Sequence, residues 1–151
     1  MKDLNEQLFD ACTEGDIDEV ESLIENGADV NAVDEYFSST ALMHVSRHGN
    51  VKIANLLINK GADVNVYDGG GWTALMHASR HGNVKIANLL IKKGADVNAN
   101  VGDVNVGDVN VGDVNANVDD FIIYGDTSLR IAVENQEIEI IKLLVKAGAR
   151  E

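Results

Sequence analysis

The residues best suited to chemistry are four histidines, which form two pairs. His44 lies four residues before His48, and His77 lies four residues before His81. On a helix this spacing places both rings on one face, where two imidazoles can chelate Zn²⁺ or Ni²⁺. No carboxylate or cysteine lies close enough in sequence to complete a tetrahedral site. We therefore expect no metal at these positions.

The sequence shows no arrangement typical of an enzyme. It lacks a phosphate-binding G-x-x-x-x-G-K motif, and no histidine has a plausible nucleophile outside the duplicated segments. Cys12 lies in an acidic segment that disfavours its thiolate, and we interpret it as a small core residue. As the only cysteine it forms no disulfide within the chain, so we expect a reducing, cytoplasmic setting, with leaderless export as an alternative. We predict no catalysis and no cofactor.

The second histidine pair belongs to a duplicated segment. Residues 73–99 repeat residues 40–66 at a shift of 33, with differences only at Val45/Ala78, Asn59/Lys92 and Val66/Ala99. Weaker copies lie at residues 8–32 and 127–149. Self-similarity at this period indicates a stacked array of small units and not a globule with one central core.

Each unit is expected to form two short helices. Leu75, Ala78 and Ser79 make one stripe at helical spacing, Thr73 suits an N-cap, and Gly82 suits the end of a helix. Such short helices need neighbours to pack against. The end units are expected to turn polar faces outward. The predicted helices are Leu4–Glu14, Ile17–Asn26, Ala41–His48, Val51–Lys60, Ala74–His81, Val84–Lys93, Ser128–Asn135 and Ile138–Ala147.

The segment TALMHASRHGNVKIANLLIKKGADVNA resembles the ankyrin repeat, whose hallmarks are T-P-L-H-x-A, a glycine between the helices and a closing G-A-D-V-N. Ala74 replaces the usual proline and Met76 the usual histidine. The resemblance covers about four units and implies an all-α repeat solenoid of helix-turn-helix pairs joined by β-hairpin loops. It also implies a protein–protein interaction module without catalysis.

We expect one domain over residues 1–151, with repeats at about 4–34, 35–67, 68–100 and 118–151. An insertion at 101–117 contains the pentapeptide VGDVN three times. It is expected to be a β-hairpin or a disordered loop. A pentapeptide-repeat β-helix is an alternative, although three copies fall short of one coil. A calcium loop is another, but Gly107 stands at its fifth position and the closing glutamate is missing.

The insertion is expected to be an addition to the array, so that removing Val101–Asn115 changes stability little. Residues 121–124 are strong strand formers, interpreted as a packed strand of the fourth unit or as part of an aromatic surface. A second function class follows from this region: a structural or self-associating protein, or an engineered scaffold, built around the insertion.

Charge is distributed unevenly along the chain, whose formal net charge is −13. Residues 1–35 carry one lysine and twelve acids, residues 36–99 seven basic groups and three acids, and residues 100–151 four basic groups and ten acids. This acidity disfavours nucleic-acid binding, and no apolar run is long enough to span a bilayer. The acidic ends either keep a monomeric array soluble or leave the basic middle to attract an acidic protein partner.

The resemblance implies that a partner binds on the concave side, against the loop tips and the inner helices. The side chains of Arg47 and Arg80 are expected in solvent there, and Trp72 is either an exposed anchor or a lid over the neighbouring loop. The fourth unit has Glu134 and Asn135 where the third has Arg80 and His81. The candidate partner-binding residues are Tyr36, Phe37, Arg47, His48, Gly70, Trp72, Arg80 and His81.

Overall fold

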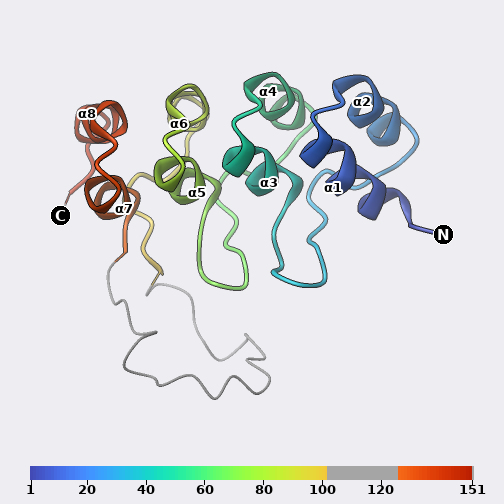
Figure 1. Ribbon diagram of the computed structural model, residues 1–151, viewed down its shortest axis with the longest axis horizontal. Helices are drawn as coiled ribbons and strands as arrows, with labels where there is room; N and C mark the ends of the chain where they lie inside the picture. Colours follow the sequence, from blue (N-terminus) through green and yellow to red (C-terminus); the bar gives the residue numbers. More distant parts are fainter. Residues whose placement is uncertain (102–125, 151) are drawn as a thin grey trace, which may run out of the picture.

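A computed structural model describes residues 1–101 and 126–150, which form a row of helix pairs (Figure 1). Every predicted helix is present; each begins where expected and ends within one residue of the expected end. The helices are α1 (Leu4–Glu14), α2 (Ile17–Glu25), α3 (Ala41–His48), α4 (Val51–Asn59), α5 (Ala74–Arg80), α6 (Val84–Lys92), α7 (Ser128–Glu134) and α8 (Ile138–Lys146).

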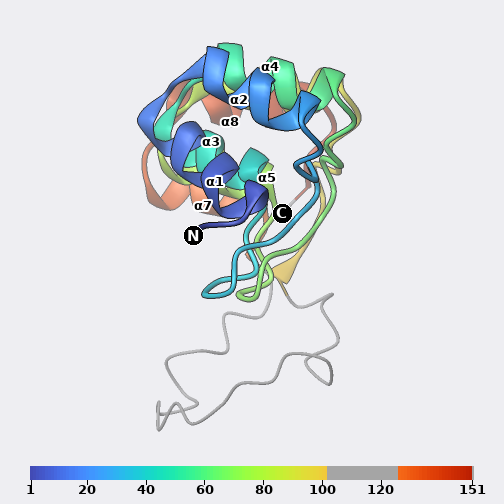
Figure 2. The same cartoon turned by 90° about the vertical axis from the view of Figure 1, so that its right-hand side faces the viewer.

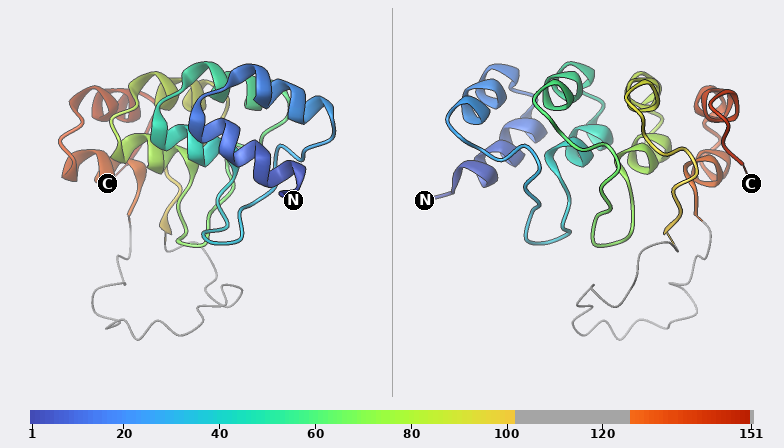
Figure 3. Two further views of the ribbon diagram at one scale, coloured as in Figure 1. Left: turned by 45° about the vertical axis from the view of Figure 1, so that its right-hand side comes forward. Right: turned by 180° about the vertical axis from the view of Figure 1, so that it is seen from behind.

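The helices form two layers. The inner helices α1, α3, α5 and α7 each pack against the next of their row, and the outer helices α2, α4, α6 and α8 do the same. The loops before α3 and α5 extend away from the inner row, side by side (Figures 2 and 3). The chain termini lie at opposite ends of the array. This arrangement is the predicted all-α repeat solenoid.

Threonine and methionine together begin the inner helices α3 and α5. Thr40 Oγ1 accepts a hydrogen bond from Met43 N at 3.3 Å, and Met43 Sδ accepts one from Thr40 N at 3.4 Å. Thr73 and Met76 repeat the exchange at 3.3 and 3.5 Å. The methionine sulfur therefore occupies the role of an acceptor at the third helical position, which satisfies an otherwise free N–H group at the helix start.

The inner helices end in left-handed backbone. Gly49 ends α3 with φ of 86°, and Gly82 lies just beyond α5 with φ of 68°. In the fourth helix pair Gln136 stands in place of this glycine and adopts φ of 59°. A side chain in this region costs about 1–2 kcal/mol relative to glycine, so the substitution noted in the sequence keeps the geometry at some cost in stability.

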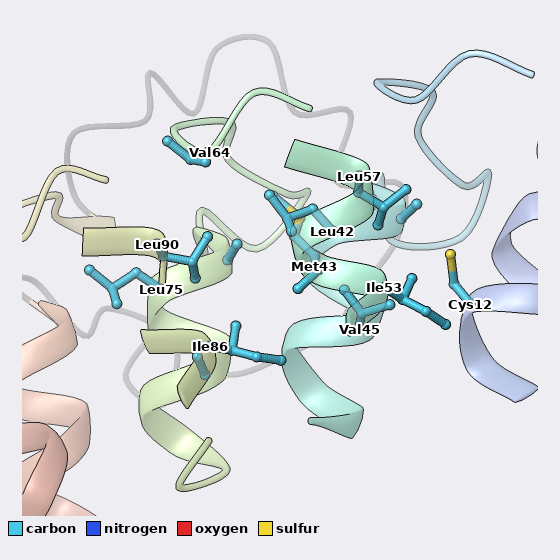
Figure 4. Close-up of a cluster of buried hydrophobic side chains, with 14 of the residues drawn as sticks. Cys12, Leu42, Met43, Val45, Ile53, Leu57, Val64, Leu75, Ile86 and Leu90 are labelled. Carbon is cyan, nitrogen blue, oxygen red and sulfur yellow. The ribbon is translucent and has the colours of Figure 1, made fainter. Parts of the chain in front are cut away.

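The core is a continuous apolar seam between the two layers (Figure 4). Leu42 and Leu75 of the inner row meet Ile53 and Ile86 of the outer row, and all four are at most 1% exposed. Cys12 is 1% exposed, which confirms it as a core residue. Burial raises the pKa of its thiol to about 12, so the thiolate is disfavoured at neutral pH.

The loops contain less β structure than a hairpin. In the described residues it is limited to isolated bridges, one between Val33 and Thr40 and one between Asn100 and Thr127. The second bridge, with a hydrogen bond of 3.2 Å from Val101 N to Asp126 O, joins the two ends of the long segment between α6 and α7. The predicted conformations of the insertion and of residues 121–124 lie outside the described residues.

The expectation that both end units turn polar faces outward is wrong at the C-terminal end. Val133, Ile138 and Val145 are 53–57% exposed. The corresponding residues Ser79 and Ile91 of the third pair are buried and half-buried, because another helix pair follows them. No further helix pair follows α8 in the described part of the chain. None of the helices in that part is long and apolar enough to cross a membrane.

Asparagine side chains fix each pair to the next on the side of the outer helices. Asn31 Oδ1 accepts from Asp63 N at 2.8 Å while Asn31 Nδ2 donates to Gly61 O at 3.1 Å. Asn65 makes the equivalent bonds to Asp96 N and Gly94 O. Asn98 continues the series to Arg150 N at 2.9 Å and Gly148 O at 3.4 Å. The series therefore continues past the insertion.

Replacing Asn98 with alanine should lower the free energy of unfolding by about 1 kcal/mol, because two hydrogen bonds between helix pairs are lost. In a chain of this length that corresponds to roughly 2–4 °C in melting temperature. Asn55→Ala is the control, since Asn55 is exposed in the middle of α4 and alanine favours helix. Thermal melts followed by circular dichroism measure both. Equal effects of the two substitutions would contradict a linking role for Asn98.

Candidate functional site

Two aspartate–histidine pairs join the loops to the inner helices. Asp34 Oδ2 lies 3.0 Å from His44 Nε2, and Asp68 Oδ2 lies 2.8 Å from His77 Nε2. The other carboxylate oxygen of each aspartate accepts backbone N–H groups of its own loop, from Tyr36 and Phe37 for Asp34 and from Gly70 and Trp72 for Asp68. Each aspartate therefore holds a candidate binding loop against the helix behind it.

An arginine connects the second pair to the helix before it. Arg47 of α3 donates from Nε to His77 Nδ1 of α5 at 3.3 Å, and its Nη2 lies 4.0 Å from Asp68 Oδ2. Because arginine only donates, Nδ1 of His77 is the acceptor and Nε2 carries the proton shared with Asp68. The hydrogen bonds thus fix the orientation of the His77 ring, and they link two adjacent helix pairs.

Trp72 covers this polar contact. Its ring centroid lies 5.3 Å from that of His77, and the guanidinium carbon of Arg80 lies 5.5 Å from the Trp72 ring centroid, within cation–π range. Trp72 is half-buried and packs with Met76, whereas Arg80 is exposed. Residues Arg47, Asp68, Trp72, His77 and Arg80 form one group, called the Trp72 cluster below. Within it Trp72 acts as a lid, and Arg80 presents the exposed charge.

The fourth helix pair replaces the polar pair with an apolar one. Val101 and Ile131 stand where Asp68 and His77 stand in the third pair. Both belong to a small cluster with Met76, Ala99 and Trp72. Because both partners are replaced together, neither position leaves half of the former pair buried and unpaired. The polar pairing is thus confined to the second and third helix pairs within the described residues.

The structure divides the candidate residues from the sequence into two groups. Arg47, Trp72 and Arg80 come together in the Trp72 cluster, with His48 and His81 exposed at the ends of α3 and α5 and Gly70 exposed at a loop tip. Tyr36 and Phe37 instead lie beside α1 and are 88% and 65% exposed. Arg47 is not free in solvent as expected; its side chain is 30% exposed because it bonds to His77.

Sequence reasoning missed the two aspartates. Asp34 and Asp68 precede their histidines by ten and nine residues, and the intervening loop determines whether they meet. The signal that could have found them is their equivalent position, in the loop before a T-A-L-M-H segment, in both duplicated units. The rings of the first histidine pair bond to different groups and do not converge on one ligand: His44 bonds to Asp34, while His48 Nδ1 donates to His44 O. No metal-binding group of three or more suitable side chains is found among the described residues.

Partial desolvation at the end of α5, together with the nearby positive charges of Arg80 and Arg47, lowers the pKa of His81 below its usual 6.5. His81 is therefore uncharged at neutral pH and adds no positive charge there. The exposed positive charge near Trp72 comes from Arg80.

A family model described as ankyrin repeats in three copies matches residues 8–101, more than half of the chain. The chain belongs to the ankyrin repeat family. The fourth helix pair, α7 and α8, lies beyond the matched residues, and its Asn98 contacts place it in the same array. The fourth helix pair differs from the two before it, because it lacks the aspartate–histidine pair.

The chain is similar to parts of longer proteins. It is 39% identical over 66 residues to ankyrin repeat and SAM domain-containing protein 6 of Rattus norvegicus, covering 44% of this chain and 8% of that protein. It is 41% identical over 56 residues to the 2-5A-dependent ribonuclease of Mus musculus, covering 37% and 8%. A putative ankyrin repeat protein of Rickettsia felis is 42% identical over 64 residues, covering 42% and 28%.

These similarities concern the repeats. Ankyrin repeats are in general protein–protein interaction modules and are typically not catalytic. The match to the ribonuclease covers only its repeat region, so its activity is not transferred to this chain.

We expect Asp34 to make a pH-dependent contribution to the free energy of unfolding. Burial alone would raise its pKa, but hydrogen bonds from Phe37 N, His44 and Tyr36 N hold the pKa of Asp34 below its usual value of 3.8. The pKa of Asp34 is lower in the folded chain than in the unfolded chain. The resulting stabilisation is therefore complete above the pKa of the unfolded state and is lost as the pH falls through the pKa of the folded state. Asp34→Asn should therefore destabilise most at pH 5–7 and least near pH 3, measured by urea unfolding.

The matched control is Glu35→Gln, at the exposed neighbouring position of the same loop. It should have a smaller effect at each pH. If the loss of stability caused by Asp34→Asn were the same at pH 3 and pH 7, the ionised carboxylate would not be the group that holds the loop.

Proposed function

We propose that this chain is a protein-binding module whose concave side holds an acidic segment of a partner against the Trp72 cluster. The surface comprises the loop tips and the exposed ends of the inner helices, with no catalytic step. Its residues are Tyr36, Phe37, Arg47, His48, Gly70, Trp72, Arg80 and His81.

The observation that supports this proposal most is the placement of the Arg80 guanidinium over the Trp72 ring. Asp68 accepts a hydrogen bond from the backbone N–H group of Trp72, and the His77 ring lies against the Trp72 ring. An exposed arginine on a rigid aromatic support loses little side-chain freedom when a carboxylate binds it. Tryptophan and arginine are also the residues that most often dominate binding energy at protein interfaces.

The charge of the middle of the chain supports an acidic partner. Residues 36–99 hold seven basic groups and three acids, in contrast to the acidic segments on both sides. Of these acids Asp68 is already paired with His77 inside the cluster. The lysines of this stretch lie on or at the ends of the outer helices α4 and α6, so the charge that the inner row offers to a carboxylate is that of Arg80. Acidic segments on both sides favour this one position along the array.

The proposal includes the wider setting. The four repeats act as one domain of residues 1–151, with the insertion as an addition, and the chain works as a monomer in the cytoplasm. The presence of a single, free cysteine, Cys12, supports a reducing compartment.

Arg80→Glu should weaken binding of an acidic partner segment at least tenfold while leaving the fold intact, because the Arg80 side chain is exposed. Acidic segments can be obtained by peptide display selection on the intact chain, and their affinities measured by fluorescence anisotropy. The effect should fade with added salt, since the attraction is between exposed charges.

Lys85→Glu is the control with the same charge change, at an exposed site on the outer helix α6. It should alter affinity less than about twofold. Arg47→Glu is unsuitable, because it removes the donor to His77 and adds a carboxylate beside Asp68. Equal losses from Arg80→Glu and Lys85→Glu would contradict the proposed surface.

A further inference from the structure

A second surface, distinct from the Trp72 cluster, lies at the N-terminal end of the inner row. A groove of about 450 Å³ runs between α1 and the loop before α3. It is called the α1 groove below, and the lining residues used in the argument are Phe9, Asp10, Asp34, Glu35, Tyr36 and Phe37.

The α1 groove has exposed aromatic walls on a fixed backbone. Tyr36 and Phe37 are 88% and 65% exposed, although large aromatic side chains usually lie buried. Their N–H groups both donate to Asp34 Oδ1, and Phe37 O accepts from Gly69 N at 2.8 Å. The loop is thus held in place before any partner arrives, which lowers the entropic cost of binding to it.

The charge of the groove is strongly negative. Five acidic residues line it, against the basic residues Lys2 and His44: Asp3, Glu6, Asp10, Asp34 and Glu35. Asp34 is engaged by His44 and the loop, and Asp3 and Glu6 bond to each other's backbone N–H groups at the start of α1. Asp10 and Glu35 remain as the carboxylates that a ligand can reach.

A cation from the chain itself already occupies one of these sites. Lys2 Nζ lies 2.5 Å from Asp10 Oδ2, and both side chains are about half exposed. The hydrogen bond to the Asp10 carboxylate and its negative charge raise the pKa of Lys2. The groove therefore accommodates a cationic side chain, and Lys2 competes with any cation offered by a partner.

We propose that the α1 groove binds an arginine side chain of a partner protein, with its guanidinium at Asp10 and Glu35 and its flat face against Tyr36 and Phe37. Arginine fits this combination better than lysine, because its planar guanidinium stacks on aromatic rings and bonds carboxylates through two N–H groups. This proposal rests on the role of the array as a protein-binding module. The partner would then have an arginine that binds in the α1 groove and an acidic segment that binds near Arg80. Two separate contacts of this kind fix the direction in which the partner lies along the array.

The test uses two short probes, acetyl-Gly-Arg-Gly-amide and acetyl-Gly-Glu-Gly-amide, titrated into the ¹⁵N-labelled chain and followed by NMR. The arginine probe should shift the amide signals of residues 33–37 and of Asp10 with millimolar affinity. Asp10→Asn with Glu35→Gln should weaken it roughly three- to tenfold, as expected for two exposed charge pairs. Lys2→Ala should strengthen it about twofold, because the competing ammonium is gone.

Asp18→Asn with Glu21→Gln is the control with the same charge change, at exposed positions of α2 outside the groove. It should leave the affinity for the arginine probe within about twofold. Dispersed NMR spectra of every variant confirm folding. The proposal is overturned if the arginine probe causes no shifts up to 20 mM (about the limit for a useful side-chain contact), or if both double variants weaken it equally.

The glutamate probe separates this proposal from the proposed function. It should shift signals near Arg80 and be sensitive to Arg80→Glu alone. If the glutamate probe caused no such shifts but the arginine probe did, the acidic-partner surface would be contradicted and the α1 groove proposal would stand. The opposite result would remove the groove proposal and leave the Trp72 cluster.

Discussion

The contacts of Asn31, Asn65 and Asn98 with the next helix pair are the constraint on which the rest of the structure depends. Each amide both donates to a glycine carbonyl and accepts a backbone N–H group of the following closing turn. A side chain bound at both ends permits one register between neighbours. Because short helices in a repeat array gain their stability from neighbours, this register also sets where the loops before α3 and α5 lie.

The two polar pairs distinguish the loops in the middle of the array from the segment before α7. In the loops before α3 and α5, an aspartate accepts two loop N–H groups and a histidine bond, which closes the loop tightly. Before α7 the corresponding residue is Val101, which offers no such acceptor and packs with Ile131 instead. The loops closed by Asp34 and Asp68 present the exposed Tyr36 and hold Trp72 in place. The longer segment before α7 has Val101 at the position of these aspartates.

The helices could be predicted from sequence because their signals are local. Thr40 and Gly49 mark the ends of α3 within nine residues of each other, and the duplication repeats these signals. The contact of Arg47 with His77 and Asp68 could not be predicted from sequence. Arg47 and His77 are 30 residues apart, and only the packing of one helix pair on the next brings them together. The apolar C-terminal face was also missed, since its residues have the pattern of an internal repeat.

The central claim is that the fourth helix pair is held by the array and not by the insertion. Amide hydrogen exchange of α7 and α8, measured in a chain lacking Gly102–Ala116, tests it most directly; this deletion keeps Val101, which packs with Ile131. Shortening a loop changes the closure free energy by only about 0.6 kcal/mol per halving, so protection of α7 and α8 should stay within about threefold of the intact chain. Loss of protection in α7 and α8, with α1–α6 still protected, would contradict the account.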